Sequence, residues 1–261
     1  MLLISTCTLS VTGTEIKHYN KMSTLNVGNI LYVGGSGPGN YSTIQEAIDN
    51  ASYLDTIFVY SGVYYENVKI YTTVVLIGED KESTIIDAGG SGDVIYVTAD
   101  NVKITGFSII NSGSYWLEAG IELNRIENCI ITENIISNCG FGIAPFITTD
   151  VTISFNIIKD NDFGISTHDT SYSNISKNSI LNNRRGIYLN EVSYCKIGKN
   201  IFIDNQRHFD FYGIFQNKIN NNYWKRFANI GPKLLLGKLF LLVPLPGFIV
   251  DWNPAQEPYD I

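Results

Sequence analysis

The sequence predicts an all-β solenoid with coils of about 22 residues, and three columns of identical residues predict it. Between residues 120 and 222, glycine, asparagine and isoleucine each recur at a constant spacing of 22. The columns are Gly120, Gly142, Gly164 and Gly186; Asn134, Asn156, Asn178, Asn200 and Asn222; and Ile131, Ile153, Ile175, Ile197 and Ile219. Such recurrence is typical of one structural unit stacked on itself. These residues are therefore expected to serve stacking before any other role.

Each coil is expected to hold three short strands that stack into parallel sheets. The first strand opens at Gly-Ile, the second carries the isoleucine column, and the third follows the asparagine column. We expect isoleucine to stack on isoleucine in the core, and the asparagines to hydrogen-bond along the axis as a ladder. Glycine is expected where a corner needs a positive φ angle. The next corner holds Asn138, Asp160, Asn182 and Asp204.

The chain divides into four predicted segments. They are a leader remnant and polar lead-in over 1–29, an N-terminal cap over 30–55, the β-helix over 56–224 with strict repeats over 120–224, and a C-terminal cap and tail over 225–261. Residues 1–13 are apolar but lack basic residues, and they are too short to span a membrane, so they indicate a weak or truncated signal peptide.

Both caps are predicted to cover the apolar ends of the stack. A helix is expected over residues 42–51, where Ile44, Ala47, Ile48 and Ala51 fall on one face. At the other end, the apolar run 231–250 contains charged and proline residues. This composition disfavours a transmembrane helix and favours a cap over the last coil.

Composition and charge exclude some classes of partner. Charged residues make up 16% of the chain and the formal net charge is -7, which argues against a nucleic-acid partner because such binding needs a basic face. Cys129 and Cys195 occupy the same repeat position three coils apart, about 14 Å, which is too far for a disulfide. They are expected to be buried thiols. Sequons at Asn40, Asn50 and Asn174 fit an exported protein.

One insertion interrupts the repeat. Ile104 aligns with Ile131 at a spacing of 27 instead of 22, so five extra residues fall within 113–119. The insertion contains Tyr115, Trp116 and Glu118. Insertions in solenoids project as loops, often beside a binding face.

The outward positions of the first strand form the candidate functional face, since they gather the most aromatic and ionisable side chains. With the insertion, the candidate carbohydrate-binding residues are Tyr115, Trp116, Glu118, Phe146, His168, Tyr188 and Tyr212. The weaker catalytic candidates are Glu122, Asp169 and Asp210. Catalysis would require these carboxylates to converge within about 5–10 Å. A plain solvated surface is the alternative.

The chain resembles a known superfamily through its Gly-Ile…Asn-x-Ile…Asn units and the entry segments YSTIQEAIDNA, DTIFVYSGVYYENVKI and LIGEDKESTIIDA. These resemble the right-handed parallel β-helix proteins of the pectin-lyase-like superfamily, and within it the NosD-type, or periplasmic copper-binding, repeat proteins of archaeal and bacterial surfaces. The resemblance covers roughly residues 30–224 and implies a single-stranded right-handed parallel β-helix. It implies no single activity, because such folds host lyases, hydrolases, epimerases, adhesins and accessory proteins.

Three functions stay open. The first is a secreted or cell-surface protein that binds or scaffolds polysaccharide or envelope components without catalysis. The second is a pectin-lyase-like polysaccharide lyase or glycoside hydrolase. The third, implied by the resemblance, is an accessory protein for copper-enzyme maturation. Against a copper site, the three histidines (His18, His168 and His208) and two methionines are not clustered. No metal and no cofactor are expected.

Overall fold

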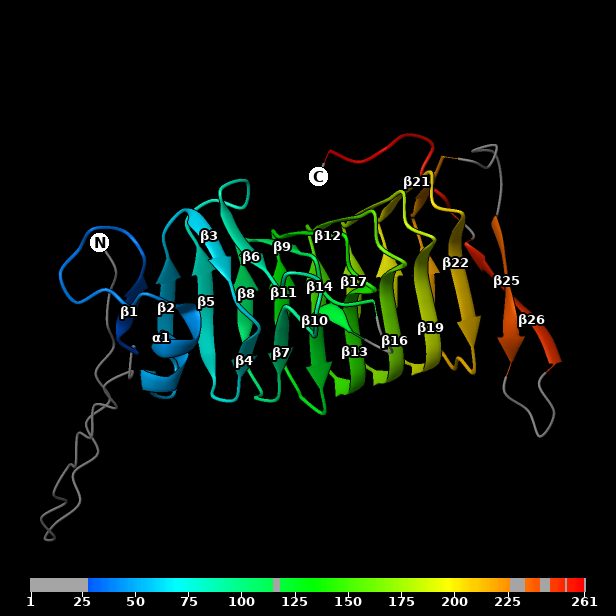
Figure 1. Cartoon of the computed structure of the whole chain (residues 1–261). Helices are drawn as coiled ribbons and strands as arrows, with labels where there is room; N and C mark the ends of the chain where they lie inside the picture. Colours follow the sequence, from blue (N-terminus) through cyan, green and yellow to red (C-terminus); the bar gives the residue numbers. More distant parts are fainter. Residues whose placement is uncertain (1–27, 115–117, 226–232, 240–244, 252, 261) are drawn as a thin grey trace, which may run out of the picture.

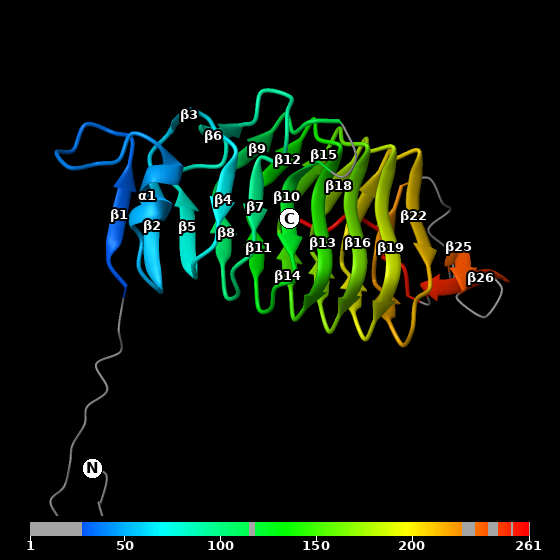
Figure 2. The same cartoon turned by 60° about the horizontal axis from the view of Figure 1, so that its bottom comes forward.

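The chain forms an elongated stack of coils, with the single described helix at one end and a β-hairpin at the other (Figures 1 and 2). The computed structural model describes residues 28–114, 118–225, 233–239, 245–251 and 253–260. The predicted leader over 1–13 and the candidates Tyr115 and Trp116 therefore lie outside the described residues. The expected β-solenoid is confirmed.

Three parallel sheets run along the stack, and each coil contributes one strand to each. Sheet A contains, in spatial order, β1 (Ile30–Val33), β2 (Asp55–Val59), β5 (Val74–Gly78), β8 (Lys103–Thr105), β11 (Ile130–Thr132), β14 (Thr152–Ser154), β17 (Asn174–Ser176), β20 (Lys196–Gly198) and β23 (Lys218–Asn220). Sheet B contains β3 (Gly62–Tyr65), β6 (Thr84–Asp87), β9 (Ser108–Ile110), β12 (Ile135–Ser137), β15 (Ile157–Lys159), β18 (Ser179–Leu181), β21 (Ile201–Ile203) and β24 (Tyr223–Trp224). Sheet C contains β4 (Val68–Ile70), β7 (Ile95–Val97), β10 (Ala119–Asn124), β13 (Phe141–Thr149), β16 (Phe163–Ser171), β19 (Arg185–Ser193), β22 (Arg207–Tyr212), β25 (Lys233–Leu239) and β26 (Leu245–Asp251).

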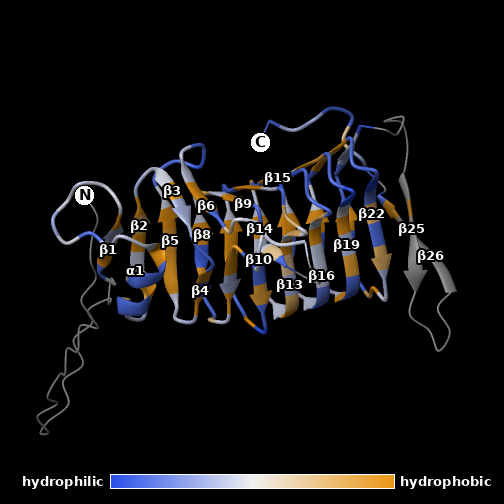
Figure 3. Cartoon of the chain, in the orientation of Figure 1, coloured by the Kyte–Doolittle hydropathy of each residue, from blue (hydrophilic) through white to orange (hydrophobic). Residues whose placement is uncertain are grey.

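The core lies inside the coils, where the isoleucine columns stack in register. Ile131 pairs with Ile153 in sheet A, and Ile121 pairs with Ile143 in sheet C. Because successive strand residues point to opposite sides, apolar and polar residues alternate along the strands, as the coloured bands of Figure 3 show. The inward side chains are almost completely buried. Burial of these apolar side chains is the main stabilising contribution, since each Å² of apolar surface removed from water contributes about 25 cal/mol to the free energy of folding.

The asparagine column forms a continuous hydrogen-bonded ladder at the corner between sheets A and B. Asn178 donates from Nδ2 to Oδ1 of Asn200 at 3.0 Å, and its own Oδ1 accepts from Asn156 Nδ2 at 3.1 Å. Each asparagine oxygen also accepts the backbone N–H of the preceding asparagine in the column. The ladder residues are 0% exposed. The ladder therefore satisfies backbone groups that would otherwise be buried without partners.

Two further corners carry similar ladders that the 22-residue columns only partly reveal. Asn161 Nδ2 donates to Asn183 Oδ1 at 3.1 Å, and Asn183 Nδ2 donates to Asn205 Oδ1 at 2.9 Å. At the third corner, Ser173, Cys195 and Asn217 each accept the backbone N–H of the residue one coil before. All three corners are thus pinned by side chains along the axis.

The glycine column has a different cause from the one expected. Gly120, Gly142, Gly164 and Gly186 do not adopt positive φ angles. Instead, a Cβ atom on Gly142 would lie 2.4 Å from the carbonyl oxygen of Gly164 in the next coil. The expectation of a positive φ at these glycines was therefore wrong: close approach of backbone from coil to coil requires them. The positive φ angles fall at corner residues such as Asn138 and Asp160.

The N-terminal cap contains α1 (Ile44–Asn50), with Thr43 as its N-cap and Ala51 as its C-cap. The helix is thus shorter at both ends than the predicted 42–51. Gln45 places its side-chain amide against the free edge of β4, accepting from Lys69 N at 2.8 Å and donating to Lys69 O at 3.3 Å. The amide imitates a neighbouring strand and protects the sheet edge. β1 lies within the predicted cap but pairs with β2 as part of sheet A.

The C-terminal end is closed by β25 and β26, an antiparallel pair that continues sheet C beyond β22. Asp251 ends β26 and takes the place of the next ladder residue. Its carboxylate is 0% exposed and accepts the backbone N–H of Asn221 and of Asn222, together with Trp224 Nε1 at 3.2 Å. Within the described ranges, no helix has the length and apolar character needed to cross a bilayer.

The cysteines behave as core residues. Cys129, Cys139 and Cys195 are free and buried, as expected for Cys129 and Cys195. Burial raises the pKa of the Cys129 thiol to about 11 and also raises the pKa of Cys139 and Cys195. These thiols therefore stay protonated near neutral pH, which makes them poor nucleophiles and poor metal ligands.

Candidate functional site

The outward side of sheet C forms a continuous face along the stack, which we call the sheet C face. Strand register places its side chains in two neighbouring columns. One column is Tyr96, Glu122, Ala144, Ser166, Tyr188 and Asp210, and the other is Asn124, Phe146, His168, Asn190 and Tyr212. Every one of these residues is half-buried. The face is therefore well packed and has few freely moving side chains.

A shallow apolar depression of about 180 Å³ lies in the middle of this face. It is lined by Glu122, Asn124, Phe141, Ala144, Pro145, Phe146, Ser166 and His168. The Phe146 and His168 rings lie 5.1 Å apart, and Phe141 stacks on Phe163 with ring centroids 4.8 Å apart. Enclosed small-molecule sites usually measure roughly 300–1,000 Å³. The depression is thus a platform with an apolar floor, not an enclosed cavity.

Two shielded polar atoms of the two columns have no partner within the described part of the chain. They are Nδ1 of His168 and Oδ1 of Asn190, which come from register partners on β16 and β19. Leaving a shielded polar group without a hydrogen bond costs about 1–3 kcal/mol. Both atoms are shielded from solvent, so a ligand recovers that free energy only if the two side chains turn toward it.

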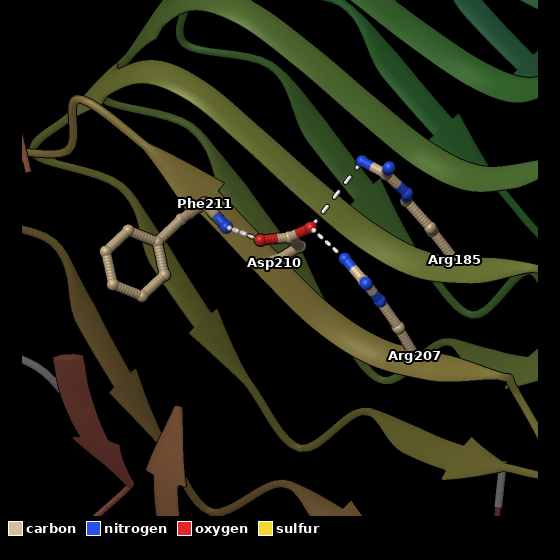
Figure 4. Close-up of polar contacts among 4 residues, drawn as sticks. All are labelled: Arg185, Arg207, Asp210 and Phe211. Atoms are coloured by element: carbon tan, nitrogen blue, oxygen red, sulfur yellow. Dashed lines mark hydrogen bonds and ion pairs between the residues drawn. The ribbon is translucent and has the colours of Figure 1, made fainter. Parts of the chain in front are cut away.

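Asp210 lies at the C-terminal end of the face between two arginines (Figure 4). Its Oδ2 is 3.5 Å from Arg185 Nη1 and 3.4 Å from Arg207 Nη1, and its Oδ1 accepts the backbone N–H of Phe211 at 3.1 Å. Arg185 also lies over the rings of Phe163 and Tyr188. Asp210 is therefore committed to an ion-pair network and holds these arginines in place.

The three carboxylates proposed from the sequence for catalysis do not converge. Glu122 and Asp210 share a column but stand four strands apart, about 19 Å at the usual strand separation of about 4.8 Å. Asp169 has a positive φ angle and lines a separate depression with Arg125 and Glu127. Glu122 and Asp210 were expected at the same outward strand position with Asp169 adjacent to that face, but the stacking of the coils keeps the carboxylates apart.

Glu118, a carbohydrate-binding candidate from the insertion, is engaged inside the loop. Its Oε1 accepts the backbone N–H of Gly92 at 3.1 Å, and its backbone oxygen accepts from Phe141 N at 3.1 Å. Its contacts tie the insertion to the coils on both sides. Glu118 thus connects neighbouring coils, and its expected contact with a ligand stays a prediction.

Asp93 was missed by the sequence reasoning. It precedes β7, and its Oδ1 accepts the backbone N–H of Ala119 at 2.7 Å. Burial raises the pKa of Asp93 to about 6; the Ala119 hydrogen bond opposes this shift, and the charges of Glu122 and Glu118 add to it. Asp93 escaped notice because Ile95 pairs with Ile121 at a spacing of 26, outside the 22-residue columns.

The described residues contain no cluster of three or more histidine, cysteine, aspartate or glutamate side chains that could hold a metal ion. His168 lies on the sheet C face, whereas His208 is buried in the last coils beside Asn205 and Trp224. The three described cysteines are buried and protonated at neutral pH. The donors that soft metals prefer are therefore dispersed over the described structure.

Solved structures of similar fold include several carbohydrate-related proteins. An alginate lyase from Paenibacillus sp. str. FPU-7 superposes with a TM-score of 0.60 at 17% identity, covering 69% of this chain and 72% of the lyase. The catalytic domain of a GH87 α-1,3-glucanase in complex with nigerose superposes with a TM-score of 0.59 at 17% identity, and the match covers 75% of this chain but 39% of the glucanase chain. XylC in complex with xylose superposes with a TM-score of 0.57 at 12% identity, and the match covers 74% of this chain and 65% of XylC. These likenesses establish the fold alone.

Comparison of sequences gives a more specific result. No curated protein sequence matches the chain. One family model matches residues 48–231, which include the asparagine ladder and both columns of the sheet C face. That family is described as periplasmic copper-binding protein (NosD). The coil repeat, the fold and this match over most of the chain agree, and the chain belongs to the NosD family.

Proposed function

We propose that the protein binds polysaccharide on the sheet C face without cleaving it. The observation that carries this proposal is the apolar platform of Phe146 and His168, next to the unpartnered Nδ1 of His168 and Oδ1 of Asn190. Sugars present apolar ring faces and hydroxyl groups that donate and accept, so they complement such a surface. The dispersal of Glu122, Asp169 and Asp210 supports binding over catalysis.

The platform and its neighbours are spaced along the axis of the stack. Tyr188 and Tyr212 follow on the next two strands toward the C-terminus, about 4.8 Å per strand. Aromatic rings contribute large contact area at a low cost in side-chain entropy. A chain of linked sugars lying across several coils would therefore meet one ring or amide per coil, which favours an extended polymer over a single sugar.

A glycan array tests this proposal when paired with assays for reducing sugars and for unsaturated products. We expect the wild-type protein to bind at least one polysaccharide with no turnover, and Phe146→Ala to weaken that binding about tenfold, equivalent to about 1.4 kcal/mol. Tyr65→Ala is the matched control, because Tyr65 is an aromatic residue of sheet B that is 77% exposed. Absence of binding to any glycan would overturn the proposal, as would equal losses in the two variants.

A second candidate function, glycoside hydrolysis, is favoured by one observation. Asp93 has a pKa of about 6 and its charge interacts with that of Glu122 on the neighbouring strand. A hydrolase needs one carboxyl group that is protonated near neutral pH and another that is ionised. If the product assays detect turnover, Asp93→Asn and Glu122→Gln should each abolish it, while Asp210→Asn should not. Turnover that survives both substitutions would exclude this pair.

The copper role in the family description finds no matching site in the described residues. His168 and His208 are on different columns, and the buried thiols are protonated at neutral pH. The described residues therefore do not fit a copper centre.

We further propose that the protein acts outside the cytoplasm. The family is described as periplasmic, and the three thiols in the described part of the chain are buried, which protects them in an oxidising compartment. Fractionation of the native host with an antibody to the protein provides the test. Recovery of the protein in the envelope or medium is expected, and recovery in the cytosol alone would contradict it.

A further inference from the structure

A second face of the molecule carries a concentration of positive charge, and its lysines differ from Arg185 and Arg207 of sheet C in having no ion pair among the described residues. It is formed by residues 172–178, 194–200 and 216–222, which include β17, β20 and β23 at the C-terminal end of sheet A. These segments contain four lysines and no aspartate or glutamate, in a chain whose net charge is -7. We call this surface the lysine face.

The lysines lie on successive coils. Lys196 and Lys218 are direct register partners in sheet A, so their backbones lie about 4.8 Å apart. Lys177 and Lys199 occupy the same corner position in neighbouring coils, both with positive φ angles. Like charges placed directly opposite each other on a sheet are destabilising. The fold thus holds positive charges together where they repel.

Nothing within the described residues neutralises three of these charges. Lys196, Lys199 and Lys218 are exposed and form no ion pair there, whereas Lys225 is paired with Asp204 at 2.8 Å. The ammonium group of Lys177 lies 4.6 Å from the centre of the Phe155 ring. An anionic ligand would therefore meet free ammonium groups and would relieve their mutual repulsion.

The remainder of the lysine face is polar and regular. Its outward strand positions carry Asn174, Ser176 and Asn220. At one edge, the rings of Tyr172 and Tyr194 stack in parallel, 5.0 Å apart, and are 60% and 42% exposed. Neither tyrosine hydroxyl has a hydrogen-bond partner among the residues described. Because their faces contact each other, these rings offer their edges and hydroxyl groups to a ligand.

We propose that the lysine face binds an anionic polysaccharide, at a site separate from the sheet C face. The amide and hydroxyl groups suit sugar hydroxyls, and four lysines spread over three neighbouring coils suit a polymer with repeated acidic groups. A protein partner fits less well, because the centre of a protein interface is normally apolar. The overall negative charge of the chain disfavours nucleic acid. The proposal does not depend on sheet C binding sugar.

Affinity electrophoresis tests the proposal, with the full-length protein run in native gels that contain polygalacturonate or neutral dextran. Mobility is normalised to a polymer-free gel. We expect polygalacturonate, but not dextran, to retard the wild type at low salt, and the retardation to fade as salt screens the charges. The triple variant K196Q/K199Q/K218Q should bind polygalacturonate at least tenfold more weakly, and thermal unfolding will show that it is folded.

A second triple variant, K69Q/K81Q/K103Q, provides the control because it changes the net charge equally at the N-terminal end of the stack. It should bind polygalacturonate like the wild type. Equal weakening in both triple variants would overturn the proposal, since binding would then follow net charge alone. Absence of retardation of the wild type, or equally tight binding of double-stranded DNA, would also overturn it.

Discussion

Gly142 shows at the scale of one residue how the solenoid constrains its sequence. Its Cα faces the carbonyl oxygen of Gly164 in the next coil, so a methyl group would overlap the backbone at 2.4 Å. Backbone cannot withdraw as a flexible side chain can. Substitution at this column must therefore separate two coils or distort both.

We predict that Gly142→Ala destabilises the protein by about 2 kcal/mol, within the range of about 1–3 kcal/mol for overpacking. Gly62→Ala is the control, because Gly62 has no positive φ and its nearest potential contact is the Tyr64 ring at 3.5 Å. That variant should be neutral or slightly stabilised, since alanine restricts the unfolded chain. Urea unfolding followed by circular dichroism measures both; similar values for the two variants would refute the close-approach explanation.

Asp93 gives a prediction about pH. Its pKa of about 6 in the folded protein exceeds the value of about 3.9 for an unfolded chain. Between about pH 4 and 6 the folded state therefore binds more protons, and the contribution of Asp93 to the free energy of unfolding falls as pH rises. Asp93→Asn removes this loss and keeps an oxygen to accept from Ala119.

We expect the Asp93→Asn variant to gain stability relative to the wild type as the pH is raised from 4 to 7. Thermal unfolding of both proteins at several pH values measures the difference. A difference that stays constant across this range, or one that shifts against the variant as the pH rises, would show that the pKa of Asp93 is not raised in the folded protein.

At the scale of an element, the asparagine ladder depends on how it ends. Asp251 from β26 accepts the backbone N–H groups of Asn221 and of Asn222, the last ladder residue, and also the Trp224 indole. The C-terminal cap thus contributes hydrogen bonds to the last coil in addition to covering its apolar end. Trp224 is fully buried and stacks on Phe202 with ring centroids 4.3 Å apart.

We predict that Asp251→Ala destabilises the C-terminal coils by about 3 kcal/mol. The substitution removes a buried acceptor and leaves its donors without a partner, and each unsatisfied buried donor costs about 1–3 kcal/mol. Asp251→Asn should have a smaller effect, since one acceptor oxygen remains. Hydrogen exchange should locate the loss in residues 196–224, because in a stacked solenoid each coil contacts only its neighbours. Uniform loss of protection along the chain would contradict this local role.

Element types and coil registers were predictable wherever the repeat is regular. Ile131, Asn134 and their column partners recur at 22 residues, and their roles follow from stacking alone. Asp251 was not predictable, because it reaches the ladder through a tail with no repeat. The ladder of Asn161, Asn183 and Asn205 was harder to recognise, because one coil earlier the same position is occupied by Cys139 instead of asparagine. Sequence spacing could not distinguish a corner glycine with positive φ from one in close contact.

At the scale of the whole molecule, the sheets of the solenoid differ in the chemistry of their outward side chains. Sheet B and the ladders hold the coils together, while the outward sides of sheets A and C carry different chemistry. The sheet C face could be anticipated from the outward columns, including Phe146, His168 and Tyr188. Asp93 and Tyr96 could not, because longer coils shift their spacing. The lysine face was overlooked because its lysines are interleaved with regular isoleucines and asparagines.

Binding of a polysaccharide on the sheet C face is the central claim, and hydroxyl-radical footprinting tests it most directly. The protein is oxidised with and without the polysaccharide that it binds most tightly, and the modification of individual side chains is measured by mass spectrometry. The account predicts that bound polysaccharide protects Phe146, His168 and Tyr188, while Tyr53 and Tyr65, which are 66% and 77% exposed, react equally in both states. Unchanged reactivity of Phe146, His168 and Tyr188 in the saturated complex would contradict the claim.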